Sequence, residues 1–246
     1  MSGTKLSVNV NKVALLRNSR QGDVPSVVEM ARLALEAGAA GITVHPRPDE
    51  RHIRAHDVDD VAALLKDWPD REFNIEGNPM EGRFMEHCRR VRPHQCTLVP
   101  DSVDQSTSDH GWDVQAHSAF LGGIVAELKE LGCRVSIFVD PEPERVDPVP
   151  EVGADRIELY TEAYAIAHLR SDFEATWARF AATAERAQDL GLGVNAGHDL
   201  NLDNLASFLK IDGVLEVSIG HALTADALRL GYAEAVGRYL ALCRND

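Results

Sequence analysis

The sequence predicts an α/β fold, a single (β/α)8 TIM barrel with extra helices, which spans residues 1–246 as one domain. Two observations predict this fold. Short runs with strand character alternate with helical patterns eight times, and no linker or change in composition interrupts the alternation. The chain of 246 residues is 44% hydrophobic, which is enough to bury one large core in the size range of a closed barrel.

The first half of the chain supplies four strand–helix units. Apolar residues at a spacing of two, or clustered β-branched residues, predict strands over 6–10, 42–45, 72–76 and 96–99. Helical spacing of apolar residues predicts helices over 24–37, 58–66, 80–91 and 120–131. Between the fourth strand and its helix lies the polar segment 100–117. We expect this segment to be a mobile lid over the barrel mouth, because most βα-loops have only about 2–6 residues.

The second half repeats the pattern. Strands are expected over 134–140, 156–160, 193–196 and 213–219. Helices are expected over 172–190, 202–209 and 225–244. Residues 141–150 are rich in proline and acidic residues and carry no helical pattern.

A doubly wound open sheet is the alternative to the barrel. Such a sheet normally carries a glycine-rich phosphate turn directly after its first strand. Here no glycine follows the first strand until Gly22. The barrel is therefore the favoured fold.

Composition limits the kinds of partner that the protein can bind and the cellular compartments in which it is expected. A net charge of −14 and a pI near 5.1 argue against a nucleic-acid surface, which needs a clustered basic face. No leader pattern and no long apolar run is present, so neither secretion nor a membrane span is expected. The four cysteines lack paired spacing and are expected to be reduced in a cytoplasmic protein.

The end of the second predicted strand is the first candidate site. His45 ends this strand, and Arg47 and His52 follow in a loop stiffened by Pro46 and Pro48. An imidazole that titrates near neutrality beside arginines suits acid–base chemistry on a phosphorylated substrate. The alternative is a solvated loop whose charges serve only solubility.

Other strand ends carry polar groups too, and barrel enzymes place their chemistry at this end. Two glycine–histidine pairs follow the last two strands, where backbone N–H groups can approach a phosphate, and Arg20 could supply a countercharge. Glu158 could instead form an ion pair with a neighbouring strand. The polar residues at strand ends are Asn9, Asn11, His45, Arg47, Glu76, the stretch 97–107, Asp140, Glu158, Tyr160, Asn195, His198, Ser218 and His221, and the two glycine–histidine pairs are Gly197-His198 and Gly220-His221.

Metal dependence is not expected. Metal-dependent barrel hydrolases commonly carry a His-x-His pair on the first strand, where this chain has Asn9-Val10-Asn11. Amides are poor ligands for zinc.

Seven segments resemble the pyridoxine 5'-phosphate synthase family of vitamin B6 synthesis over nearly the whole chain. They are VNxxxxxxLRNxR (Val8 to Arg20), GITVHPRPDERHI, FNIEGNP, TLVPD, DRIELYTE, VNAGHDLNLDN and EVSIGHAL. The resemblance implies a (β/α)8 barrel that assembles into homo-octamers. It also implies the condensation of 3-amino-2-oxopropyl phosphate with 1-deoxy-D-xylulose 5-phosphate, which releases inorganic phosphate and water and uses no metal or organic cofactor.

The resemblance also implies residue roles. His45 and Glu76 would accept protons, His198 would donate one, and Glu158 would stabilise charge in the transition states. The residues implied for the aminoketone phosphate are Asn9, Arg20, Gly220 and His221. Those implied for the deoxyxylulose phosphate are Arg47, His52 and Thr107. The chain departs from the common pattern at Asn11-Lys12 and at Asp199, where many members have Asp-His and Gly; we expect these three to contact substrate with altered detail.

Two other functions remain open on the sequence. One is a lyase or isomerase that acts on a different sugar phosphate. The other is a non-catalytic binder of pyridoxal-type phosphates, although binding alone does not require four titrating groups at strand ends.

Overall fold

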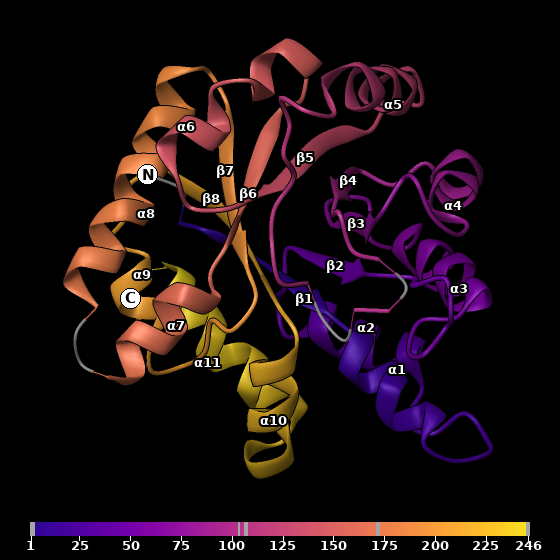
Figure 1. Cartoon of the computed structure of the whole chain (residues 1–246). Coiled ribbons are helices and arrows are strands. Elements are labelled where there is room, and N and C mark those ends of the chain that lie inside the picture. Colours follow the sequence, from indigo (N-terminus) through magenta and orange to yellow (C-terminus); the bar gives the residue numbers. More distant parts are fainter. Residues whose placement is uncertain (1–2, 103, 106–107, 171–172, 245–246) are drawn as a thin grey trace.

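The computed structural model describes residues 3–102, 104–105, 108–170 and 173–244 as an eight-stranded parallel barrel surrounded by helices (Figure 1). The strands are hydrogen-bonded in sequence order, and the last pairs with the first, with Leu6 opposite Val217. The predicted (β/α)8 barrel is therefore confirmed. The strands are β1 (Lys5–Asn9), β2 (Gly41–Val44), β3 (Glu72–Gly77), β4 (Gln95–Leu98), β5 (Arg134–Val139), β6 (Arg156–Tyr160), β7 (Gly193–Gly197) and β8 (Val214–Ile219).

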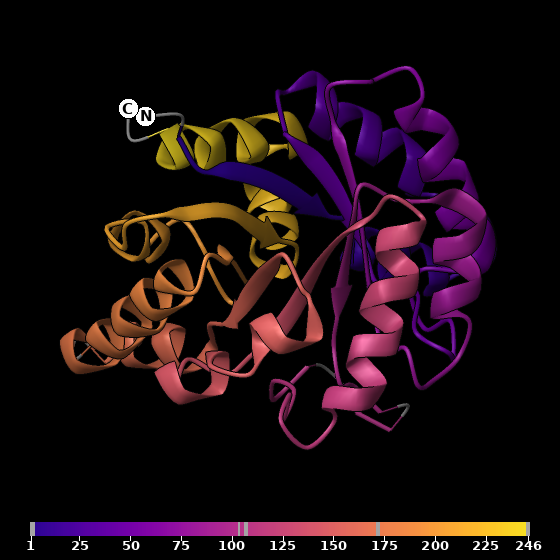
Figure 2. The same ribbon diagram turned by 90° about the horizontal axis from the view of Figure 1, so that it is seen from above.

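Helices form the outer layer, as the view in Figure 2 shows. The end of the last helix meets the start of β1, where the Thr4 backbone N–H donates to the Cys243 carbonyl over 2.9 Å. The helices are α1 (Asn11–Asn18), α2 (Val27–Glu36), α3 (Ala55–Leu65), α4 (Phe84–Val91), α5 (Ser118–Glu130), α6 (Pro143–Val146), α7 (Glu162–Leu169), α8 (Glu174–Asp189), α9 (Leu205–Phe208), α10 (His221–Leu230) and α11 (Tyr232–Arg244), with a 3-10 turn at Val149–Val152.

Four helical segments differ from the prediction. The first βα-connection contains α1, where no helix was predicted. Helix α7 precedes the predicted helix 172–190 and was not predicted, and α6 lies in the proline-rich segment that carried no helical pattern. The predicted helix 225–244 is two helices, because Gly231 between them has a φ of 87°, which ends α10.

Successive side chains of each strand point alternately towards the helices and into the barrel. On β3, Phe73 and Ile75 belong to the apolar core between barrel and helices. Side chains of the other face meet inside the barrel, since Gln95 on β4 donates to Glu216 on β8, which is not a neighbouring strand, over 3.1 Å. Near the amino-terminal end, Arg156 lies 3.5 Å from Glu216. The interior is therefore a hydrogen-bonded polar layer rather than the branched apolar filling typical of barrels.

In the part of the chain that the structure describes, no helix combines the length and apolar character needed to cross a bilayer.

Candidate active site

A cavity of about 370 Å³ opens where the strands end and the βα-loops begin. All the predicted site residues except Arg20 and Thr107 line it. These are Asn9, Asn11, Lys12, His45, Arg47, His52, Glu76, Glu158, His198, Asp199, Gly220 and His221. The sequence pattern therefore identified side chains that the fold brings together from six strand ends.

The two exceptions differ in kind. Arg20 lies in the exposed turn after α1 and is not among the residues that line the cavity. Thr107 lies outside the described residues. The predicted substrate contacts of both residues stay predictions.

His45 and Glu76 form a buried pair at the ends of β2 and β3. His45 Nδ1 lies 3.7 Å from Glu76 Oε2, and the two residues are 6% and 4% exposed. Burial, together with the nearby Arg47 guanidinium, lowers the pKa of His45 well below its usual value. Burial and the negative charge of Asp101 raise the pKa of Glu76 to about 8. At neutral pH the pair therefore consists of an unprotonated imidazole and a protonated carboxyl.

Asn9 and Asn11 hold this pair in place. The Asn11 side-chain oxygen accepts from the His45 backbone N–H over 2.9 Å, and the Asn9 side-chain oxygen accepts from the Asn11 N–H over 3.0 Å. The Asn9 side-chain amide donates to Glu76 Oε2 over 3.5 Å. Besides lining the cavity, both asparagines position the acid–base groups. The sequence pattern predicted only substrate contacts for these two asparagines and carried no signal for the positioning role.

Glu158 on β6 is 2% exposed and faces the same cavity. Burial and the neighbouring Glu76 raise the pKa of its carboxyl well above the usual value. Gly197 makes room for it, because a Cβ at position 197 would lie 2.6 Å from Glu158 Oε1. The expected alternative, an ion pair with a strand arginine, is not formed by Arg156, which contacts Glu216 and Asn195 instead.

His198 is presented by an unusual turn after β7. His198 and Asp199 have φ values of 72° and 49°, and the Thr161 hydroxyl secures the turn by donating to the Gly197 carbonyl over 2.6 Å. The His198 ring packs against Phe138 and Tyr160. Burial, followed by the Arg47 and Lys12 charges, lowers the pKa of His198 to about 4, so its imidazole is neutral at physiological pH.

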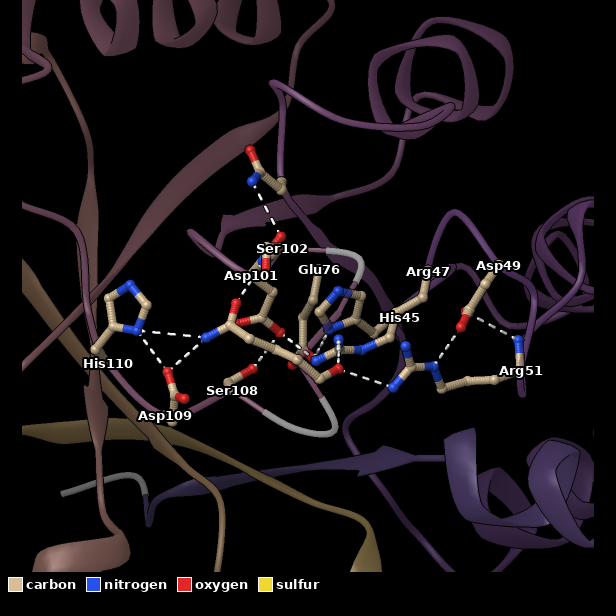
Figure 3. Close-up of polar contacts among 12 residues, drawn as sticks. His45, Arg47, Asp49, Arg51, Glu76, Asp101, Ser102, Ser108, Asp109 and His110 are labelled. Carbon is tan, nitrogen blue, oxygen red and sulfur yellow. Dashed lines mark hydrogen bonds and ion pairs between the residues drawn. The ribbon is translucent and has the colours of Figure 1, made fainter.

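The segment after β4 lies against the arginines of the β2 loop (Figure 3). Arg47 pairs with buried Asp101, and Arg47 Nη1 donates to the Gln105 carbonyl over 2.8 Å. Arg51 Nη1 donates to the same carbonyl over 2.8 Å, and the Ser108 hydroxyl donates to Asp101 Oδ2 over 2.6 Å. The sequence analysis did not single out Asp101, although it ends the TLVPD segment.

His52 lines the cavity together with Arg47 and Lys12. Burial, then the Arg47 and Lys12 charges, lowers its pKa to about 3, so the ring is neutral at physiological pH. Arg47 and Lys12 line the same cavity and are suited to anionic groups, Arg47 as a planar fork and Lys12 as a point charge. The site therefore combines proton donors and acceptors with cations, which is an arrangement for acid–base chemistry on phosphorylated compounds. Among the described residues, no group of three or more His, Cys, Asp or Glu side chains is arranged to hold a metal ion.

Comparison with known proteins shows the family of the chain. The family described as pyridoxal phosphate biosynthesis protein PdxJ matches residues 6–245. A protein of Albidiferax ferrireducens named pyridoxine 5'-phosphate synthase is 55% identical over 242 residues, which cover 96% of each chain. A protein of the same name from Chelativorans sp. is 52% identical and covers 97% of this chain and 98% of its own.

The solved structure of phosphoribosyl anthranilate isomerase from Thermotoga maritima has a TM-score of 0.62, with coverage of 99% of this chain and all of that one. At 11% identity this likeness shows the fold alone. Family membership is shown by the sequence relatives. The resemblance seen in the motifs is therefore confirmed, and the chain is an enzyme that belongs to the PdxJ family of pyridoxal phosphate biosynthesis proteins.

Proposed function

We propose that the chain condenses 3-amino-2-oxopropyl phosphate with 1-deoxy-D-xylulose 5-phosphate to give pyridoxine 5'-phosphate, inorganic phosphate and water. We propose that it acts in the cytoplasm as a homo-octamer of single-domain chains, without a metal or organic cofactor. The observation that carries the proposal is the set of four titrating groups around one cavity, His45, Glu76, Glu158 and His198. Membership of the PdxJ family and the name of the relatives support it.

The reaction requires proton transfers in both directions. An amine must condense with a ketone, a β-phosphate must leave, a C–C bond must close the ring and water must be lost. The neutral imidazole of His45 can accept a proton, and the protonated carboxyl of Glu76 beside it can give one. Once Glu76 has given its proton to a substrate oxygen, its carboxylate is the acceptor that the family resemblance implies.

His198 acts as proton donor in this proposal, although its imidazole is neutral at physiological pH. The Arg47 and Lys12 charges help to depress its pKa. A phosphate dianion bound to these cations offsets their field and raises the pKa of His198 towards neutrality. Substrate binding therefore prepares the donor. Glu158, which is buried near the same centre, stabilises charge that develops in the transition states.

The family resemblance implies two phosphate positions, and the cations and backbone N–H groups at the cavity support them. Gly220 and His221, at the start of α10, lie beside Asn9 and are assigned to the aminoketone phosphate, with Arg20 as a further predicted contact. Arg47 and His52 are assigned to the deoxyxylulose phosphate, with Thr107. Asn11, Lys12 and Asp199 contact substrate at the cavity wall.

The direct test is an assay of purified protein with both substrates. We expect stoichiometric phosphate release and the appearance of the pyridine absorbance only when both substrates are present. Phosphate release from one substrate alone would indicate a lyase. Tight binding of the pyridine product without turnover would indicate a binding protein.

We expect metal independence, because the chemistry proposed here is assigned entirely to side chains. Protein treated with a strong chelator and checked by elemental analysis should keep its full turnover. Stoichiometric zinc that is lost together with activity, and restores it when added back, would contradict the proposal.

We expect the segment 100–117 to act as a lid. Its described part already contacts Arg47 through Asp101 and Gln105, and its far end is fixed where Gly111 packs on the end of β5, a position at which a Cβ would clash with Val139. Phosphorylated ligands should slow amide exchange in this segment and leave β6–β8 nearly unchanged, because closure excludes water from reactive intermediates. Deleting residues 103–109 should lower turnover while the barrel stays folded. Equal exchange with and without ligand would show a passive surface segment.

A further inference from the structure

The LRN segment of the first motif has no part in the proposed chemistry, yet its arginine is buried. Arg17 is 3% exposed on α1 and pairs with Asp57, which is 2% exposed on α3. The pairing is two-pronged, because Arg17 Nη1 meets Asp57 Oδ1 while Arg17 Nη2 donates to Asp57 Oδ2 over 2.9 Å. Asp57 also accepts from the Arg54 backbone N–H over 2.7 Å and lies 3.5 Å from the exposed ring of His56.

A buried ion pair contributes little net stability in general, because desolvation of both charges offsets their attraction. The contacts of this pair suggest a different use. Arg17 Nη2 also donates to the His52 carbonyl over 3.2 Å, so the guanidinium spans from α3 to the loop that carries His52. The loop is thereby tied to two helices at once.

Asn18 ties the same loop from the neighbouring position. Its side-chain amide nitrogen lies 3.4, 3.1 and 2.8 Å from the carbonyl oxygens of Glu50, Arg51 and His52. The His52 carbonyl therefore receives donors from both Arg17 and Asn18. No other backbone group of this loop is bonded by both side chains among the described contacts.

The ring of His52 is fixed from the following residue. The Ile53 backbone N–H donates to His52 Nδ1 over 2.9 Å, and the Ile53 side chain is fully buried. A nitrogen that accepts an N–H cannot carry a proton, so the proton of the neutral ring lies on Nε2. His52 is therefore a hydrogen-bond donor through Nε2 and not a base.

We propose that Arg17, Asn18 and Asp57 form a clamp that holds the loop 50–54 so that His52 offers its Nε2–H to the phosphorylated substrate. The three are positioning residues, since they act through His52 and do not line the cavity. The clamp gives a role to the adjacent Arg17 and Asn18 of α1. The proposal rests on the proposed function only for the contact between His52 and substrate.

The test compares Asn18→Ala and Asp57→Asn with Ser19→Ala as the matched control. Ser19 lies in the same turn, but its hydroxyl donates only within α1, to the Leu16 carbonyl. The first readout is the ¹⁵N spectrum of the histidine rings, with the His52 signals identified by their loss in His52→Gln. The second is the KM for each substrate.

In wild-type protein and Ser19→Ala, we expect one protonated and one unprotonated His52 nitrogen across pH 6–8. In both clamp variants the two signals should move towards each other, because a loosened loop breaks the bond between the Ile53 N–H and His52 Nδ1 and the ring then samples both tautomers. The KM for deoxyxylulose phosphate should rise about tenfold, the usual worth of a well-placed hydrogen bond. The KM for the aminoketone should stay within about twofold.

Asn18→Ala removes the acceptor of Arg17 Nε but keeps both charged groups of the buried ion pair, so it tests the clamp even if Asp57→Asn does not fold. Unchanged His52 signals in Asn18→Ala would overturn the proposal, whether the KM values stay at wild-type level or rise equally. If the wild-type protein shows no turnover with these substrates, the proposed function fails, and the ring signals still decide whether the clamp exists.

Discussion

Replacement of His45 with asparagine is expected to lower turnover by about 10²–10⁴-fold, the usual worth of a positioned proton-transfer group. The neutral imidazole of His45 lies 3.7 Å from Glu76 and can accept a proton from the substrate. An asparagine side chain at position 45 cannot accept that proton. The barrel should stay folded, because the Asn11 side chain bonds the backbone N–H of residue 45 and not its side chain. Steady-state assays at saturating concentrations of both substrates, together with circular dichroism, measure the two effects.

His168→Asn is the control for the loss of an imidazole outside the cavity, since His168 lies on α7 and packs against Tyr164. It should keep wild-type turnover. A His45→Asn variant with near-normal turnover would rule out His45 as the proton acceptor and would leave Glu76 to carry that role.

The Glu76→Gln variant should lose turnover by about 10²–10⁴-fold and gain stability in alkali. Burial raises the pKa of Glu76 from 4.5 to about 8, so the folded protein holds this proton more tightly than the unfolded chain does. The stability gained from that proton is complete below pH 4.5 and is lost as the pH rises through about 8. Glutamine resembles the protonated carboxyl and does not ionise.

Urea unfolding at several pH values measures this effect. We expect the free energy of unfolding of Glu76→Gln to exceed that of the wild type by about 1–4 kcal/mol at pH 9 and to match it near pH 4. Glu174→Gln, an exposed change at the start of α8, should show no such difference. If Glu76→Gln had the same stability as the wild type at pH 9, the carboxyl would not be held protonated by its surroundings.

The fold could be predicted from local pattern because a parallel barrel is built from repeated units. Each strand has an apolar face towards the helices, as Phe73 and Ile75 show on β3, and each unit ends in a turn that sequence marks well. Helix boundaries were harder to predict. Helix α1 has only eight residues, and one of its buried residues is the charged Arg17, so its sequence lacks a clear apolar face. The burial of Arg17 is explained only by its contacts with α3 and the loop 50–54.

The members of the site could be predicted because strand order fixes where strand ends meet. In a closed parallel barrel, residues at the ends of β2, β3, β6 and β7 converge on one mouth whatever the intervening sequence. His45, Glu76, Glu158 and His198 follow from that rule alone.

The sequence by itself determined the barrel and the set of ionisable groups at its mouth, because both depend on side-chain identity and spacing along the chain. Only the tertiary structure decided the protonation states of these groups and which neighbouring residues support them. The pKa of Glu76 depends on burial and on Asp101, which lies 25 residues away in sequence and is held by Arg47. Asn9, at the end of β1, donates to Glu76 over 3.5 Å, and Asn11, at the start of α1, accepts from the His45 backbone N–H over 2.9 Å, so both support residues that are distant in sequence. Charge and hydrogen bonding act through space, and their energies are set by distance and dielectric surroundings that no linear pattern records.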